Sequence, residues 1–155
     1  MNIISRIKAS AHCDIPCGIY EPIPAKIAAR TVFKMVSQLK TFDMPKDAKD
    51  KTAALQYLNS VSRRITVKEE HAQLCKKELY ILWSDFFKPP HIEKHPELHD
   101  LFWQAAKLCS KNKQEINEDA ARDLIDHVDK IARIFYEVEN APEKYNAYKE
   151  LTDRL

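Results

Sequence analysis

Apolar residues recur at three- and four-residue intervals in four stretches of this chain, which places them along one face of an α-helix. The chain of 155 residues contains a single glycine and few of the turn sequences that join β-strands. Its length is that of one domain with a continuous core. Because four helices that each carry one apolar face are best buried as a bundle, the sequence predicts an all-α, antiparallel, up-down four-helix bundle.

Prolines and polar residues separate the expected helices. Pro24 suits the first helical position of the first helix, and Pro89-Pro90 should end the second helix after Lys88. The side chain of Asn117 is a good N-cap for the fourth. The tail after Pro142 is expected to add a short helix. The apolar faces fall within residues 32–39, 58–86, 98–109 and 124–138.

Charge and hydropathy exclude some classes of partner. The net charge of +2 is too small to indicate binding to nucleic acid or to an anionic membrane. No apolar run approaches the length of a membrane span. We therefore expect neither kind of partner, and a chain without an export signal is expected in the cytoplasm.

Residues 1–11 resemble a short leader. Arg6 and Lys8 are basic, and the small residues Ala9-Ser10-Ala11 are of the kind that peptidases cut after. An export signal would also need an apolar core of about 7–15 residues, which this segment lacks. We expect a processing peptidase to remove it without export, although an attached, frayed N-terminus is the alternative.

Two of the four cysteines, Cys75 and Cys109, fall in register with the apolar faces of their helices. A thiol on such a face is expected to be buried and inert. These two residues are therefore predicted to belong to the core.

Three histidines, His91, His95 and His99, are spaced four residues apart, which on one helix would make them metal ligands on a shared face. Pro90 and Pro96 interrupt the segment, and the residue before a proline is disfavoured in the helical region. We expect these histidines to make caps and loop contacts instead.

The other two cysteines, Cys13 and Cys17, lie outside any apolar face and follow His12. Their spacing indicates a metal site or a redox pair. A structural disulfide is the alternative, and a reducing cytosol disfavours it.

A cut between Ala11 and His12 would make this stretch a strong chelator. The freed amine of His12, the amide nitrogen of Cys13 and the Cys13 thiolate could close two small chelate rings, and Cys17 would add a fourth donor. The His12 imidazole could approach from above. Two nitrogens and two sulfurs in a plane favour Ni(II) or Cu(II) over tetrahedral zinc.

The single glycine, Gly18, follows this stretch directly. A turn that folds back over a metal within a few residues needs a position without a Cβ penalty, which glycine provides. Pro16 should stiffen the turn, and the Ile15–Pro16 bond is a candidate for a cis peptide.

Two segments resemble a known family. The stretch "HCDIPCGIY" is similar to the N-terminal metal hook of nickel superoxide dismutase, which begins His-Cys-x-x-Pro-Cys-Gly-x-Tyr. The stretch "LWSDFFKPPHIEKHPELH", residues 82–99, resembles that family's segment at the end of its second helix. With the four-helix prediction, the similarity covers residues 12–138.

The resemblance implies a homohexamer of four-helix bundles with one nickel ion per subunit. Residues 12–20 would form the hook after the leader 1–11 is removed, and residues 21–155 would form the bundle with its tail. It also implies that two superoxide anions and two protons give dioxygen and hydrogen peroxide through a Ni(III)/Ni(II) cycle.

The same resemblance implies roles for individual residues. His12 would ligate nickel through its amine and, in the oxidised state, its imidazole. Cys13 would ligate through its amide nitrogen and sulfur, and Cys17 through its sulfur. Asp14 would steady the turn, Tyr20 would screen the open face of the metal, and Lys88 would lie near the same pocket.

Three positions depart from the family pattern. A glutamate and an arginine that orient the axial imidazole are replaced by Ala28 and His71, and a tyrosine beside the screening tyrosine is replaced by Phe86. Since such partners set the orientation and basicity of a metal-bound histidine, our hypothesis is that His71 takes over part of this role.

Two other functions compete with the enzyme. A non-catalytic helical module could use Cys13 and Cys17 to bind metal or sense thiol oxidation, and it would not need a free His12 amine. A helical interaction scaffold would leave the order of these residues as coincidence.

Overall fold

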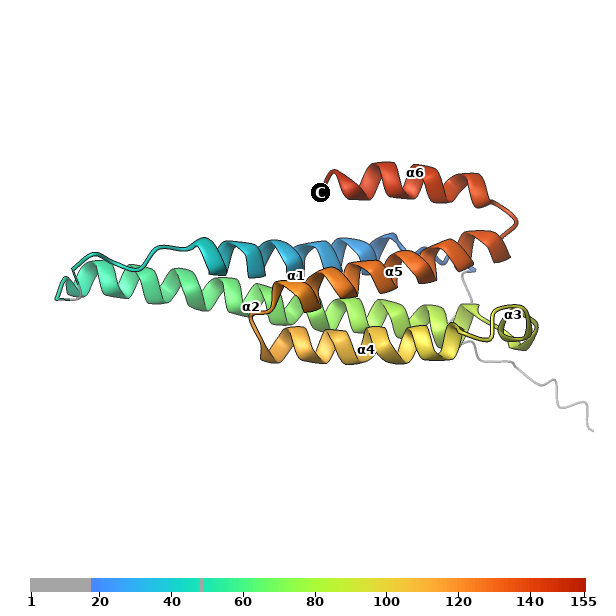
Figure 1. Cartoon of the computed structure of the whole chain (residues 1–155), viewed down its shortest axis with the longest axis horizontal. Coiled ribbons are helices and arrows are strands. Elements are labelled where there is room, and N and C mark those ends of the chain that lie inside the picture. The colour runs from blue at the N-terminus through green and yellow to red at the C-terminus, as the bar shows by residue number, and fades with distance from the viewer. Residues whose placement is uncertain (1–17, 48) are drawn as a thin grey trace, which may run out of the picture.

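The computed structural model describes residues 18–47 and 49–155, and these residues form helices joined by short connections, without a strand (Figure 1). The predicted ligands His12, Cys13 and Cys17 and the predicted turn residue Asp14 lie outside the described residues. The helical elements are α1 (Ile23–Thr41), α2 (Lys51–Ile81), the π-helical η1 (Leu82–Phe86), α3 (Pro89–Lys94), α4 (Leu98–Gln114), α5 (Glu118–Val138) and α6 (Pro142–Asp153).

Four long helices form the predicted bundle. Helix α1 packs against α2 and α5, and α4 packs against the same two helices, so that each successive long helix runs antiparallel to the one before (Figure 1). The tail forms α6, which lies on α5 and α1, as the predicted extra helix. Within the described part of the chain, no helix has both the length and the apolar character needed to cross a membrane.

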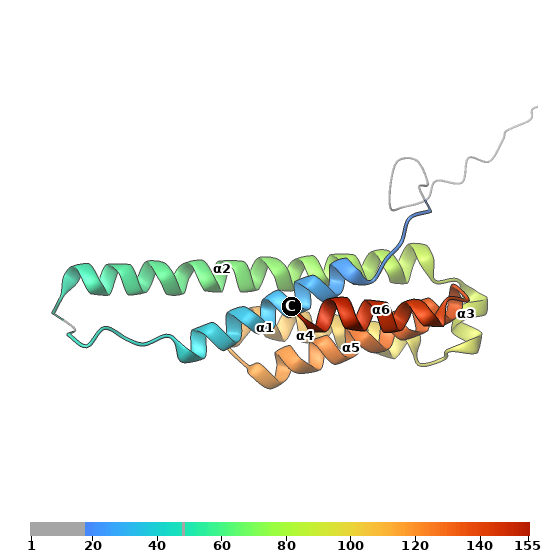
Figure 2. The same ribbon diagram turned by 90° about the horizontal axis from the view of Figure 1, so that it is seen from above.

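Helix α2 is longer than the sequence pattern predicts. It begins at Lys51, where the side chain of Asp50 accepts a hydrogen bond from the Ala53 N–H at 3.0 Å. Its first turns extend beyond α4 and α5 (Figures 1 and 2). The prediction that Leu58 lies on a buried face is therefore wrong, since this side chain is 60% exposed.

The end of the second helix also differs from the prediction. Instead of continuing to Lys88, the chain passes into η1, where the Phe87 N–H donates to the Leu82 carbonyl, five residues back, at 3.0 Å. The wider turn adds one residue before the chain returns to the core. As a result Phe87 is buried, and Phe86, expected on the core face, is only half-buried.

The Asn117 and cysteine signals are confirmed, whereas Pro24 is the second residue of α1 and follows Ile23. The Asn117 side chain accepts from the Ala120 N–H at 3.0 Å and so caps α5. Cys75 and Cys109 are both fully buried. A hydrogen bond to Cys109 and burial raise the pKa of Cys75 well above its usual value, which keeps it an unreactive thiol.

Lys68 is a buried cation that the periodicity does not reveal. Its side chain is 2% exposed, and its Nζ donates to the carbonyls of Asn112, Lys113 at 2.9 Å and Glu115 at 3.2 Å. These carbonyls lie at the carboxyl end of α4, where helical acceptors lack partners within the helix. Lys68 therefore fastens α2 to the end of α4.

We expect Lys68→Met to lower the free energy of unfolding by about 2 kcal/mol, because several buried acceptors lose a charged donor. Urea denaturation measures the change. Lys77→Met is the matched control, since Lys77 is exposed on the same helix, and it should stay within about 0.5 kcal/mol of the parent. Equal losses in the two variants would contradict the anchoring role of Lys68.

Candidate metal centre

The chain enters the described structure through a left-handed turn. Gly18 directly follows Cys17 and has φ +67°, a conformation that residues with a Cβ rarely adopt. An added Cβ at Gly18 would meet no atom within 4 Å. The glycine is therefore required by backbone conformation and not by lack of space, as the sequence predicts.

A cavity of about 480 Å³ opens beside this turn. Gly18 and Tyr20, of the segment before α1, form part of its wall, and η1, the residues after it and the end of α5 complete it. Two predicted site residues, Tyr20 and Lys88, thus share one cavity. The other lining residues are Asp85, Phe86, His91 and Glu139.

Aromatic rings build one wall of this cavity. The Tyr20 ring lies with its centroid 5.6 Å from that of Phe86. Phe86 in turn packs on Phe135 of α5, with centroids 4.4 Å apart. The π-helical turn η1 makes this contact possible, because it leaves Phe86 half-buried while Phe87 occupies the core position. Tyr20 is therefore placed by packing against the bundle.

The backbone of Lys88 is fixed by the residues that follow it. It has an extended conformation (φ −128°, ψ 163°) before Pro89, and its N–H donates to Nδ1 of His91 at 3.2 Å. The His91 ring lies 6.0 Å from that of Phe86, between centroids. Because Nδ1 accepts this hydrogen bond, the neutral His91 ring carries its proton on Nε2.

Three lining residues are not expected from the sequence. Asp85, His91 and Glu139 come from η1, α3 and the residue after α5, and nothing in their spacing brings them together. His91 stands three residues after Lys88 and behind a Pro-Pro pair. That arrangement was a local signal for a cap at the start of α3, but not for a place in the cavity wall.

The three histidines of residues 91–99 do not form a metal site. His95 lies 3.8 Å from Glu97 and 3.9 Å from Glu137, and His99 accepts a hydrogen bond from the Trp83 indole N–H at 3.0 Å. The predicted cap positions are confirmed for His91 and His95 of α3, whereas His99 lies within α4 and contacts η1. Within residues 18–47 and 49–155, no group of three or more His, Cys, Asp or Glu side chains is arranged to hold a metal.

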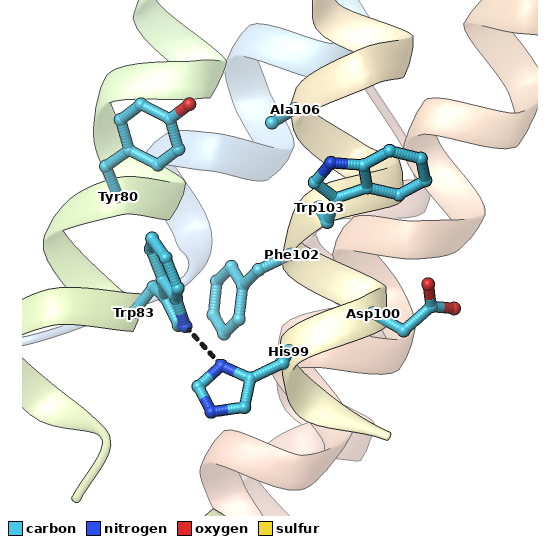
Figure 3. Close-up of a pocket in the computed structure, with 7 residues that line it drawn as sticks. All are labelled: Tyr80, Trp83, His99, Asp100, Phe102, Trp103 and Ala106. Atoms are coloured by element: carbon cyan, nitrogen blue, oxygen red, sulfur yellow. Dashed lines mark hydrogen bonds between the residues drawn. The ribbon is translucent and has the colours of Figure 1, made fainter. Parts of the chain in front are cut away.

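A larger cavity, of about 570 Å³, lies between the end of α2, η1 and α4 (Figure 3). Trp83 and Trp103 lie on opposite sides of it, and the Trp83 indole N–H donates to His99, which also lines it. The wall is almost entirely aromatic and contains one carboxylate, Asp100, which does not point toward His99 (Figure 3). This cavity offers no converging ligands for a metal.

The replaced family positions have different surroundings. Ala28 is fully buried in the core, and Phe86 contacts Tyr20 as described above. His71 donates from Nδ1 to the Val67 carbonyl, 2.9 Å away on its own helix. It stands about 16 Å along the helix from Leu82 and does not line the cavity beside Gly18. A role for His71 near the metal stays a prediction.

Comparison with known proteins shows similarity over most of the chain. A sequence model of the family described as nickel-containing superoxide dismutase matches residues 7–139. The nickel superoxide dismutase of Streptomyces seoulensis is 38% identical over 136 residues, which cover 88% of this chain and 94% of that protein. The enzyme of Streptomyces coelicolor is 35% identical with the same coverage.

Solved structures show the same similarity. A native nickel superoxide dismutase matches with a TM-score of 0.69 and 34% identity, covering 83% of this chain and 99% of the other. A nickel-containing superoxide dismutase with the nickel ligation of the oxidised state matches with a TM-score of 0.70 and 35% identity, covering 84% and 100%. The fold and the sequence thus point to one family.

We expect Gly18→Ala to weaken nickel binding about 5- to 30-fold in a chain that begins at His12. The left-handed conformation costs an alanine about 1–2 kcal/mol, and no steric clash adds to this. Gly18→Asn is the matched variant, because asparagine tolerates this conformation better, and it should lose less. Isothermal titration with Ni(II) measures both, and equal affinity in all three chains would show that the turn does not persist around the metal.

Proposed function

The chain belongs to the nickel-containing superoxide dismutase family, and from this premise we propose which of its residues hold the metal and receive the substrate. It is a nickel-dependent superoxide dismutase, which converts two superoxide anions and two protons to dioxygen and hydrogen peroxide. When bound, nickel supplies the one-electron chemistry by alternating between Ni(III) and Ni(II). A non-catalytic metal-binding or thiol-sensing module is not favoured.

The proposed ligands are His12, Cys13 and Cys17. The donor set of amine, imidazole, amide nitrogen and two thiolates suits a metal with square-planar preference and stabilises its higher oxidation state. The observation that carries the proposal is the left-handed turn at Gly18, which follows Cys17 and opens onto a cavity lined by Tyr20 and Lys88. No rival metal-ligand cluster is present in the described part of the chain.

Removal of residues 1–11 is the proposed activation step. While Ala11 is joined to His12, the nitrogen that should ligate is an amide whose lone pair is delocalised and donates poorly. Cleavage by a processing peptidase converts it to a primary amine. Residues 12–20 then form the hook, and residues 21–155 form the domain that carries it.

Tyr20 and Lys88 are the proposed substrate-handling residues of the cavity. Lys88 is the one cationic side chain among the lining residues that the structure describes, so it favours the entry of an anion such as superoxide. The Tyr20 ring packs against Phe86 in the wall of this cavity, and it is proposed to limit what can reach the metal. Asp14 is proposed to steady the turn between Cys13 and Cys17.

Assembly and location are also proposals. Similarity to the family supports a homohexamer with one nickel site per subunit. The exposed rings of Trp83 and Trp103 give the bundle an apolar surface that contact between subunits would cover. The lack of an apolar core in residues 1–11 supports a cytoplasmic location.

We expect a chain that begins at His12 to bind one nickel ion and consume superoxide, whereas the full chain should do neither to a comparable extent. The physical reason is the primary amine, which exists only in the cut chain. Metal analysis and a superoxide-consumption assay measure the difference.

The sharpest control is a chain that begins at Ala11. It keeps both thiols and the imidazole and differs by one residue, yet its His12 nitrogen is an amide. Activity in this chain equal to that of the His12 chain would refute the proposed ligand set.

We expect Lys88→Ala to lower kcat/KM for superoxide about three- to tenfold and to flatten its dependence on ionic strength, because a charge that attracts the anion is lost. Lys88→Arg should retain most of both. Lys94→Ala, which removes an exposed charge outside the cavity, is the control. Pulse radiolysis at several salt concentrations tests this, and an unchanged salt dependence in Lys88→Ala would remove Lys88 from substrate attraction.

A further inference from the structure

Helix α6 lies outside the part of the chain that the family accounts for. The family model ends at residue 139, and α6 spans Pro142–Asp153. The helix packs on α5 and on the beginning of α1, which is the element that follows the hook (Figures 1 and 2). The matched family region therefore does not include the contacts of α6.

Helix α6 covers a buried ion pair between α1 and α5. Lys26, in the first turn of α1, is fully buried, and its Nζ lies 2.6 Å and 2.7 Å from the two carboxylate oxygens of Asp129. From α6, the Tyr148 hydroxyl donates to Asp129 at 2.8 Å and Lys149 donates to it at 2.7 Å. Asp153 accepts from Lys26 at 3.3 Å. The pair is thus enclosed and satisfied by α6.

The same helix reaches the segment that carries the hook. The Tyr148 ring is 2% exposed and packs against Tyr136 of α5, with centroids 5.9 Å apart. The Tyr136 hydroxyl donates to a carboxylate oxygen of Glu21 at 2.7 Å. Glu21 follows Tyr20 and stands four residues after Cys17. A chain of contacts therefore runs from α6 through α5 to the base of the hook.

The Tyr136–Glu21 hydrogen bond joins the segment before α1 to α5. Tyr136 is 3% exposed, and burial followed by the bond to Glu21 raises the pKa of its hydroxyl, which keeps it a donor. Pro22, which directly follows Glu21 and is also buried, is the N-cap residue of α1. Within residues 18–22, Glu21 is thus hydrogen-bonded to α5, and Pro22 leads directly into α1.

We propose that α6 is a clasp that fixes residues 18–22 against the bundle, with Tyr148 and Tyr136 as positioning residues for the nickel hook. The proposal rests on the hook assigned above. The proposed nickel ligands all lie within the first six residues of the cut chain. The segment that follows them therefore sets how the bound metal is oriented toward the cavity. In this chain that segment is held by a helix beyond the family's own domain.

The test uses a chain that begins at His12 and extends to Leu155. Tyr136→Phe removes the hydroxyl that holds Glu21, and Tyr148→Ala removes the ring that supports Tyr136. Tyr145→Phe is the matched control, since Tyr145 lies on α6, stacks on Tyr148 and makes no described contact with Tyr136. Amide hydrogen exchange at residues 19–23 of the metal-free protein and titration with Ni(II) are the two measurements.

Tyr136→Phe and Tyr148→Ala should each speed exchange at residues 19–23 about tenfold and weaken Ni(II) binding by a similar factor. They should also shift the visible absorption bands of the bound metal, while exchange in α2 and α4 and all properties of Tyr145→Phe stay unchanged. Where Tyr148→Ala fails to fold, Tyr148→Leu removes the ring contact with Tyr136 but keeps an apolar side chain in the core, and it should change the same quantities in the same direction.

Unchanged exchange at residues 19–23 in the Tyr136 and Tyr148 variants would overturn the clasp. Faster exchange with unaltered nickel affinity and spectrum would overturn its link to the metal. Failure of the unaltered His12 chain to bind nickel would instead refute the proposed ligand set, and the exchange measurement, which needs no metal, would still decide whether α6 holds this segment.

Discussion

The packing of the first turn of α1 against the second half of α5 is the contact on which the site depends, because residues 18–22 lead directly into α1 and line part of the cavity. The Lys26–Asp129 pair lies in this contact, and a buried charge that lost its partner would be strongly unfavourable. The two helices are therefore held in one register. The Tyr136–Glu21 hydrogen bond also joins α5 to the segment that precedes α1. A short terminal segment has no core of its own, so the bundle supplies its geometry.

The part of the cavity wall that Phe86 forms depends on the π-helical turn η1. In an uninterrupted α-helix, Phe86 would continue the buried face of Leu79 and Leu82. The π-helical turn η1 inserts one residue, so Phe87 fills the core and Phe86 is left to meet Tyr20. The aromatic contact between Tyr20 and the bundle is thus a consequence of backbone hydrogen bonding in η1.

The sequence predicted the helices but not their limits or their buried charges. Caps such as Asn117 and the apolar periodicity are local signals, which is why the bundle and the extra helix could be foreseen. Leu58 was misplaced because periodicity says nothing about whether a partner helix is long enough to cover it. Lys26 and Lys68 interrupt apolar faces with a residue that normally reaches water, and only the opposing carboxylate or carbonyls, distant in sequence, explain their burial.

Some residues of the cavity could be predicted from short motifs, and others are brought there only by the fold. Tyr20 and Lys88 could be assigned from a resemblance carried by short motifs, whereas Asp85 and Glu139 join them only through the fold. Their presence changes the electrostatic argument. The carboxylates of Asp85 and Glu139 offset the ammonium group of Lys88, so the cavity as a whole is not a general anion site. Attraction of superoxide therefore depends on how closely the anion approaches Lys88, and a small monoanion can approach it without lying against the two carboxylates.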